Sequence, residues 1–191
     1  PWVYGPWVST VDANPLSLAG TAISPSLPLR LFFTAVLIAA LFTFLSVRGD
    51  MRPQARIEGR ADVIDGDTIT VAGATVRLYG VDAPEPAQRC DEAGRDWACG
   101  QAAAAALAGH LRNRVVACEE RAYGGPDLMV ATCVLGGQDI AAWLARSGWA
   151  MAYVKFSKRY IPEEAVARAR GVGLWKGQFE PPWDWRRARR R

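Results

Sequence analysis

The stretch Val63–Glu85, VIDGDTITVAGATVRLYGVDAPE, decides the fold of this chain. Two short runs of alternating apolar and polar residues, 69–71 and 75–81, lie on either side of Ala72-Gly73-Ala74. Alternation of this kind is typical of strands with one buried face, and small residues with a central glycine are typical of turns. The stretch therefore predicts a β-hairpin.

The polar residues of this hairpin are expected to gather on one surface. If the turn centres on Gly73, Asp67 faces Tyr79 and Arg77 is its diagonal neighbour. Asp82 and Glu85 follow where the chain leaves the sheet. Three acids near one arginine are costly unless a cation or a phosphate lies between them. Two alternatives stay open: a one-residue change of register moves Asp67 to the other face, and the acids can also form a plain polar turn.

The chain after this hairpin carries further strand and helix patterns. Strands are predicted at 56–64, 115–119 and 128–135, and helices at 100–112, 139–148 and 162–170. Strands dominate the first half and helices follow later, so the predicted class is α+β rather than a repeated βαβ array.

The composition limits the chemistry that this protein can perform. The chain has 191 residues, half of them hydrophobic and 22% charged, which suits one globular domain with an accessory segment. A single histidine nearly excludes a histidine metal cluster or histidine-based acid–base catalysis, so carboxylates and arginines must carry the chemistry. Residues 186–191 include five arginines, whereas residues 56–185 carry a net charge of −2. Such a basic tail suits contact with nucleic acid or anionic lipid, or a solvated end.

The N-terminal part contains a hydrophobic segment. Residues 31–47 are 17 residues without a charge, between Arg30 and Arg48. We expect one hydrophobic helix over 30–48, a transmembrane anchor or a signal segment, after a flexible leader at 1–29. A buried helix and a later start at Met51 are the alternatives. The arginines after the segment favour a cytoplasmic C-terminal side, whereas the cysteines discussed below favour the opposite orientation.

The motif Val63–Glu85 resembles the signature of the staphylococcal nuclease (thermonuclease) family. Later stretches match in the same order: Cys99-Gly100, Tyr123-Gly124, DIAAWLARSGWAMAY at 139–153 and GLWKGQFEPPWDWR at 173–186. The resemblance covers residues 56–186, which defines the predicted nuclease-like domain and leaves 187–191 as a basic tail. It implies a five-stranded OB-fold β-barrel with three helices.

The resemblance also implies a calcium-dependent phosphodiesterase site. Asp67 and Asp82 match the two metal carboxylates, and Ala83 matches the position whose backbone carbonyl binds the metal. Hard oxygen ligands of this kind suit Ca²⁺. Glu85 matches the general base that activates water, and Arg77 matches the residue that binds the phosphate. A carboxylate base with a cationic clamp needs no histidine.

One position departs from the family pattern. The family continues Tyr-Gly-Arg, and that arginine is a second cation on the phosphate, whereas this chain has Tyr123-Gly124-Gly125-Pro126. Half of the arginine clamp is therefore missing, and Arg121 or Arg89 from nearby loops are the candidate replacements. Loss of one such donor typically lowers a rate by about 10²–10³-fold.

Three further residues are expected to bind the substrate. The resemblance places Tyr123 and Tyr153 in the nucleotide pocket, where stacking tolerates any base. Lys155 stands where the family has a second aromatic residue, and its ammonium group is expected to contact a phosphate. Ordinary packing is the alternative for both tyrosines.

The four cysteines suggest two disulfides. Cys90 and Cys99 flank a short loop, and the family fold places Cys118 and Cys133 on neighbouring strands, so two local pairs are expected. A zinc site is a weak alternative because no Cys-x₂-Cys spacing occurs. Disulfides indicate an oxidising compartment, so the domain is predicted to lie outside the cytoplasm, anchored by residues 31–47 or secreted if that segment is cleaved.

The expected function is that of a calcium-dependent nuclease that hydrolyses DNA and RNA without sequence specificity. Nucleic acid is the expected partner, with the membrane through 31–47, and no protein partner is implied. The alternatives are a membrane-tethered nucleic-acid-binding barrel without activity and a purely structural barrel. The second would leave the acids without a purpose.

Overall fold

The computed structural model describes residue 38 and residues 54–190, and the latter fall within one compact unit, Pro53–Arg191. The predicted leader lies outside the described residues, as does the predicted hydrophobic helix apart from residue 38, so both stay predictions. Among the described residues, no helix combines the length and the apolar character needed to cross a membrane.

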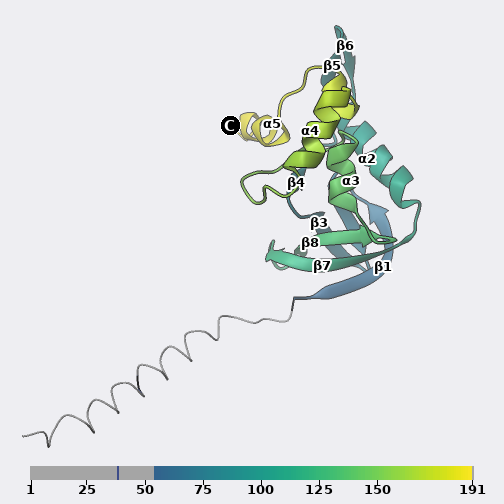
Figure 1. Ribbon diagram of the computed structural model, residues 1–191, viewed down its shortest axis with the longest axis vertical. Helices are drawn as coiled ribbons and strands as arrows, with labels where there is room; N and C mark the ends of the chain where they lie inside the picture. The colour runs from purple at the N-terminus through teal and green to yellow at the C-terminus, as the bar shows by residue number, and fades with distance from the viewer. Residues whose placement is uncertain (1–37, 39–53, 191) are drawn as a thin grey trace, which may run out of the picture. The chain divides into compact units, whose positions relative to one another are not determined.

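Five strands close into a barrel (Figure 1). Their order is β3-β2-β1-β7-β8, and each neighbouring pair is antiparallel. A parallel pairing between β3 and β8 closes the ring. The five-stranded barrel with helices agrees with the predicted OB-like α+β class. The strands are β1 (Arg56–Val63), β2 (Thr68–Val71), β3 (Ala74–Leu78), β7 (Val115–Tyr123) and β8 (Leu128–Leu135).

The β2–β3 hairpin forms, but its predicted register is wrong by one residue. Thr68 pairs with Arg77 and Val71 with Ala74, so the loop is the two-residue turn Ala72-Gly73 rather than a three-residue turn. Both loop residues have positive φ, 50° and 81°, which is the geometry of the two-residue turns that match strand twist. Asp67 precedes β2, so the alternation of the strand does not fix the direction of its side chain.

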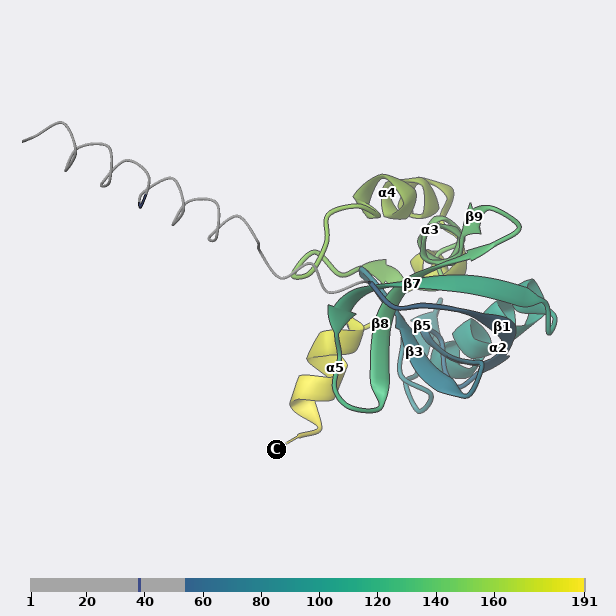
Figure 2. The same ribbon diagram turned by 90° about the horizontal axis from the view of Figure 1, so that it is seen from below.

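Four α-helices lie within residues 54–190, one more than predicted. The additional helix is α5 (Pro182–Ala188), which lies at the C-terminal end of the described residues (Figure 2). The other three agree with the sequence prediction to within two residues at most ends: α2 (Cys99–Leu111), α3 (Ile140–Arg146) and α4 (Ile161–Arg170). The shorter elements are β4 (Val81–Asp82), β5 (Cys90–Glu92), β6 (Arg95–Trp97), β9 (Gln138–Asp139), β10 (Met151–Ala152) and the 3₁₀ helix η1 (Gly173–Lys176).

One hydrophobic core joins the barrel to its helices. Apolar residues of the strands, α2 and α3 pack together, each below 2% exposure: Ile69, Val71, Val76, Leu78, Leu107, Leu111, Val116, Ile140 and Leu144. Asp139 caps α3 by accepting the N–H of Ala142 at 3.1 Å, as the sequence predicts.

Two disulfides are present, with the pairing that the sequence and the resemblance predict. Cys118–Cys133 joins facing residues of β7 and β8. Cys90–Cys99 joins the start of β5 to the start of α2. No free cysteine remains among the described residues.

Candidate active site

Asp67 is held in the turn between β1 and β2. Asp65 forms this turn, because its carboxylate accepts the N–H of Asp67 at 3.0 Å. The carboxylate of Asp67 accepts the hydroxyl of Thr68 on Oδ1 and the N–H of Ala83 on Oδ2, both at 2.9 Å. These contacts fix a carboxylate that is only 5% exposed.

The buried carboxylate of Asp67 carries a poorly balanced negative charge. Burial, helped by the neighbouring charge of Asp65, raises the pKa of Asp67 from 3.8 to about 7. The N–H of Ala83 and the guanidinium of Arg77 oppose this shift, but the Arg77 Nε lies 3.7 Å from the carboxylate. A hard cation would supply the charge that these groups do not.

Asp82 is the second buried acid, at 4% exposure. It lies on β4, which pairs with β10 through Asp82 and Met151. Burial raises its pKa, while hydrogen bonds from Arg186 lower it. Arg186 binds both oxygens: Nη1 donates to Oδ1 at 2.8 Å and Nη2 to Oδ2 at 2.7 Å.

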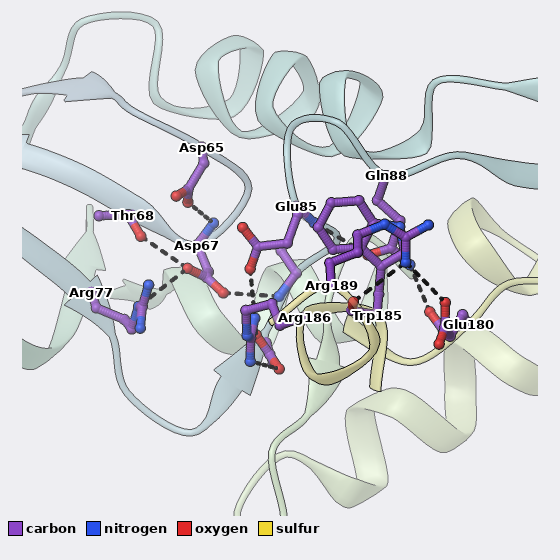
Figure 3. A network of polar contacts seen from close by, with 12 residues as sticks. Asp65, Asp67, Thr68, Arg77, Glu85, Gln88, Glu180, Trp185, Arg186 and Arg189 are labelled. Atoms are coloured by element: carbon purple, nitrogen blue, oxygen red, sulfur yellow. Dashed lines mark hydrogen bonds and ion pairs between the residues drawn. The ribbon is translucent and has the colours of Figure 1, made fainter. Parts of the chain in front are cut away.

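Glu85 lies in the loop after β4, where two residues fix the backbone. Gln88 is fully buried, accepts the Glu85 N–H on its side chain and donates its own N–H to the Glu85 carbonyl. Gly100 at the start of α2 packs so closely that a Cβ there would collide with that same carbonyl oxygen. The carboxylate reaches toward Arg186, whose Nη1 donates to Oε1 at 2.7 Å (Figure 3).

The arginines Arg77 and Arg186 border one cavity of about 280 Å³, the two-arginine pocket. Arg77 comes from β3 and Arg186 from α5, so distant parts of the chain meet there (Figure 3). Asp82 also lines the pocket, as do four aromatic residues: Tyr79, Tyr123, Tyr153 and Phe156.

The predicted substrate residues divide into two groups. Tyr123 and Tyr153 line the two-arginine pocket, whereas Lys155 is exposed and is not among its lining residues. The candidate replacements for the missing arginine are both elsewhere: Arg121 binds Glu119 and Thr132, and Arg89 pairs with Asp96. Neither arginine lines the two-arginine pocket, and each is paired with an acid outside it.

The donor atoms suit a hard cation, although they do not form a ready metal centre. Within residues 54–190, no three acidic, histidine or cysteine side chains gather closely enough to hold a metal. Asp67 and Asp82 are nevertheless buried carboxylates with raised pKa values, and each oxygen has a second lone pair beyond its present hydrogen bond. Water and substrate oxygens would have to complete the coordination of such an ion. The carbonyl of Ala83 as third ligand stays a prediction.

Fold and site together define a class of protein. It is a small OB-like barrel with buried acids next to a pocket that is lined by two arginines and several aromatic rings. Residues 75–177 match the family model described as staphylococcal nuclease homologue. The chain belongs to this family.

Two curated proteins are similar over most of their length. The chain is 38% identical over 147 residues to the succinoglycan biosynthesis protein ExoI of Rhizobium meliloti (strain 1021), which covers 75% of this chain and 77% of that protein. It is 27% identical over 167 residues to an uncharacterized endonuclease of Haemophilus influenzae (strain ATCC 51907 / DSM 11121 / KW20 / Rd), which covers 83% and 85% respectively. At family level, these findings support a nuclease that acts on nucleic acid.

Sequence reasoning missed Arg186 as a site residue. In the sequence it is the last residue of the matched stretch 173–186 and also the first of the arginine-rich end, whose charge suggests a solvated tail. The available signal was its place directly after Pro182-Trp183-Asp184-Trp185, because two tryptophans next to an arginine anchor a segment rather than leave it in solvent. Trp183 indeed stacks on Tyr153, with ring centroids 5.6 Å apart.

Proposed function

We propose that this protein is a calcium-dependent nuclease that hydrolyses phosphodiester bonds of DNA and RNA without sequence specificity. The observation that carries the proposal is the two-arginine pocket, where guanidinium groups and aromatic rings lie beside buried acids. Guanidinium groups bind phosphate, and aromatic rings stack on bases of any identity.

Glu85 is proposed as the general base. One of its oxygens binds Arg186, and the other has no hydrogen-bond partner among residues 54–190. Its side chain keeps 27% of its surface exposed, so a water molecule can reach it. In the reaction, the water oxygen bonds to phosphorus, Glu85 takes the water proton, one ester P–O bond breaks and the leaving oxygen takes a proton from solvent.

Arg77 is proposed to bind the phosphate. Its side chain is 48% exposed at the pocket, and its only ion pair within residues 54–190 is the long one with Asp67. The guanidinium is therefore available to the negative charge that grows on the phosphate oxygens. Asp67 and Asp82 would hold Ca²⁺, with the carbonyl of Ala83 as a further ligand, and the bound ion supplies additional stabilisation of that charge.

Tyr123 and Tyr153 are proposed to hold the base and sugar. Tyr123 is 77% exposed at the pocket mouth, whereas Tyr153 is fixed between Phe156 and Trp183. One exposed ring and one ring packed between other aromatic residues suit a strand of variable sequence.

The two disulfides support action in an oxidising compartment outside the cytoplasm. We propose that residues 31–47 anchor the chain there or direct its export.

The test of the enzymatic proposal is degradation of single-stranded DNA and RNA by the full chain, with calcium and with EDTA. Glu85→Gln keeps the size and most hydrogen bonds of the side chain but removes the base, so the rate should fall by about 10²–10⁴-fold. Glu58→Gln is the matched control, because Glu58 is exposed on β1 and the same charge is lost.

Calcium-dependent cleavage that disappears in Glu85→Gln and persists in Glu58→Gln supports the nuclease. Binding of DNA without cleavage by the wild-type chain contradicts it and leaves the inactive nucleic-acid-binding barrel.

A further inference from the structure

Arg186 lies at the centre of the candidate site, although it is more than 100 residues away from the acids in the sequence. It contacts Asp82 at a separation of 104 residues and Glu85 at a separation of 101. Its side chain is 26% exposed, compared with 6% for Asp82. The guanidinium therefore covers the acids on one side and meets the two-arginine pocket on the other.

The hydrogen bonds of Arg186 leave one binding face of the guanidinium free. The group has five N–H donors: two on each Nη and one on Nε. Asp82 takes one donor from each Nη, and Glu85 takes the second donor of Nη1. The Nε–H and the second N–H of Nη2 have no acceptor among residues 54–190. These two donors lie side by side on the guanidinium and match two oxygens of a phosphate.

Several contacts hold the helix that carries Arg186. Pro182 is buried, and Trp183 stacks on Tyr153. The buried Gln88, which fixes the Glu85 backbone, also donates to the carbonyl of Glu180 just before α5, at 2.6 Å (Figure 3). Gln88 thus holds both the loop of Glu85 and the segment before α5. These contacts fix the position of Arg186 relative to the acids.

We propose that Arg186 binds the substrate phosphate and serves as the second guanidinium of the site, opposite Arg77. This inference rests on the proposed function, since it names a further residue for the same substrate. Arg186 supplies from α5 the cation that the sequence lacks after Tyr123-Gly124. It also keeps Asp82 and Glu85 in place while its free face binds phosphate oxygens.

The test compares the affinity of the full chain for thymidine 5′-monophosphate and for thymidine, by calorimetry with calcium and with EDTA. The monophosphate has no diester bond to cleave, so binding is measured apart from catalysis. For Arg186→Ala, we expect about 10–100-fold weaker binding of the monophosphate, the usual cost of a lost charged hydrogen bond, and an unchanged affinity for thymidine. Arg186→Lys keeps the positive charge but lacks the two paired donors. Its affinity for the monophosphate should therefore fall several-fold.

Arg187→Ala is the matched control. Arg187 is the next residue on α5, its side chain is 74% exposed and it pairs with Asp184. Removal of this charge should change the monophosphate affinity less than twofold. Tryptophan fluorescence and the melting temperature show whether each variant folds. If Arg186→Ala does not fold, the monophosphate affinity of Arg186→Lys tests the inference instead.

Three results would overturn the inference. Arg186 variants that fold and bind the monophosphate like the wild type show that the free donors face no phosphate. Equal losses for the monophosphate and thymidine show that Arg186 only holds α5. Equal losses in the Arg186 and Arg187 variants show a general charge effect. Failure of the nuclease proposal is distinguishable, because it appears as a wild-type chain that does not cleave DNA.

Discussion

At the scale of single residues, Asp67 is a buried acid whose negative charge lowers the stability of the fold. Its carboxylate is buried, and the groups around it do not balance its charge, so its pKa lies at about 7. A carboxyl group with a pKa raised in the folded state stabilises the fold only while it is protonated. The contribution of Asp67 to the free energy of unfolding is complete below the pKa of the unfolded state, 3.8. It is lost as the pH rises through about 7, the pKa in the folded state.

Asp67→Asn should therefore stabilise the metal-free protein. The amide keeps the size of the side chain and has no charge to bury. In EDTA, the difference in unfolding free energy between variant and wild type should be small at pH 4 and grow to a few kcal/mol by pH 8. Urea denaturation across this pH range measures it. A difference that does not vary with pH would contradict the assigned cause.

At the scale of the elements, the accuracy of sequence reasoning depended on local signals. Alternation, Asp139 as a cap and Pro162 near a helix start placed β1, β8, α3 and α4 closely. The hairpin register was wrong, because two-residue and three-residue turns around Gly73 differ by only one residue. Both turns satisfy the same local sequence, and only packing selects between them.

The acids and Arg77 lay within one motif, so their proximity was predictable from the sequence. Arg186 was not predictable in this way, because its position depends on the packing of Trp183 against Tyr153. Contacts between residues so distant in sequence leave no periodic pattern. Lys155, which the resemblance places at the substrate, is exposed and lies outside the lining, although Tyr153 two residues earlier belongs to it.

The Cys118–Cys133 disulfide should stabilise the β7–β8 strand pair of the barrel. It joins β7 to β8 across a separation of 15 residues, and β8 pairs with β3, which carries Arg77. Replacement of both cysteines by alanine should lower the unfolding free energy by about 3 kcal/mol, as expected for a loop of this length. Urea denaturation of oxidised wild type and variant measures the loss, and an unchanged midpoint would refute it. As a control, the unfolding of the variant is compared with that of the wild type after reduction of its disulfides.

For the whole molecule, a bound cation should act as a ligand of the folded state. If Asp67 and Asp82 bind Ca²⁺, calcium at 100 times its dissociation constant adds about 2.7 kcal/mol of stability. The melting temperature should then rise by roughly 5–15 °C for a domain of this size. Differential scanning calorimetry with calcium or EDTA measures the rise. Asp82→Asn should abolish it, and an equal rise in that variant would place the ion elsewhere.

Arg186 lies far in the sequence from its partners Asp82 and Glu85, and this distance affects how the site can change between related proteins. The acids and Arg77 are encoded together within residues 67–85, whereas the second guanidinium is delivered by α5, about one hundred residues later. The two halves are nevertheless coupled, because Arg186 hydrogen-bonds to Asp82 and Glu85. Replacement of the C-terminal segment would alter phosphate recognition and remove the hydrogen bonds from Arg186 to Asp82 and Glu85. The hydrogen bonds of Asp67 with Thr68 and Ala83 do not involve α5. For protein engineers, α5 is thus a segment through which phosphate recognition and the positions of Asp82 and Glu85 change together.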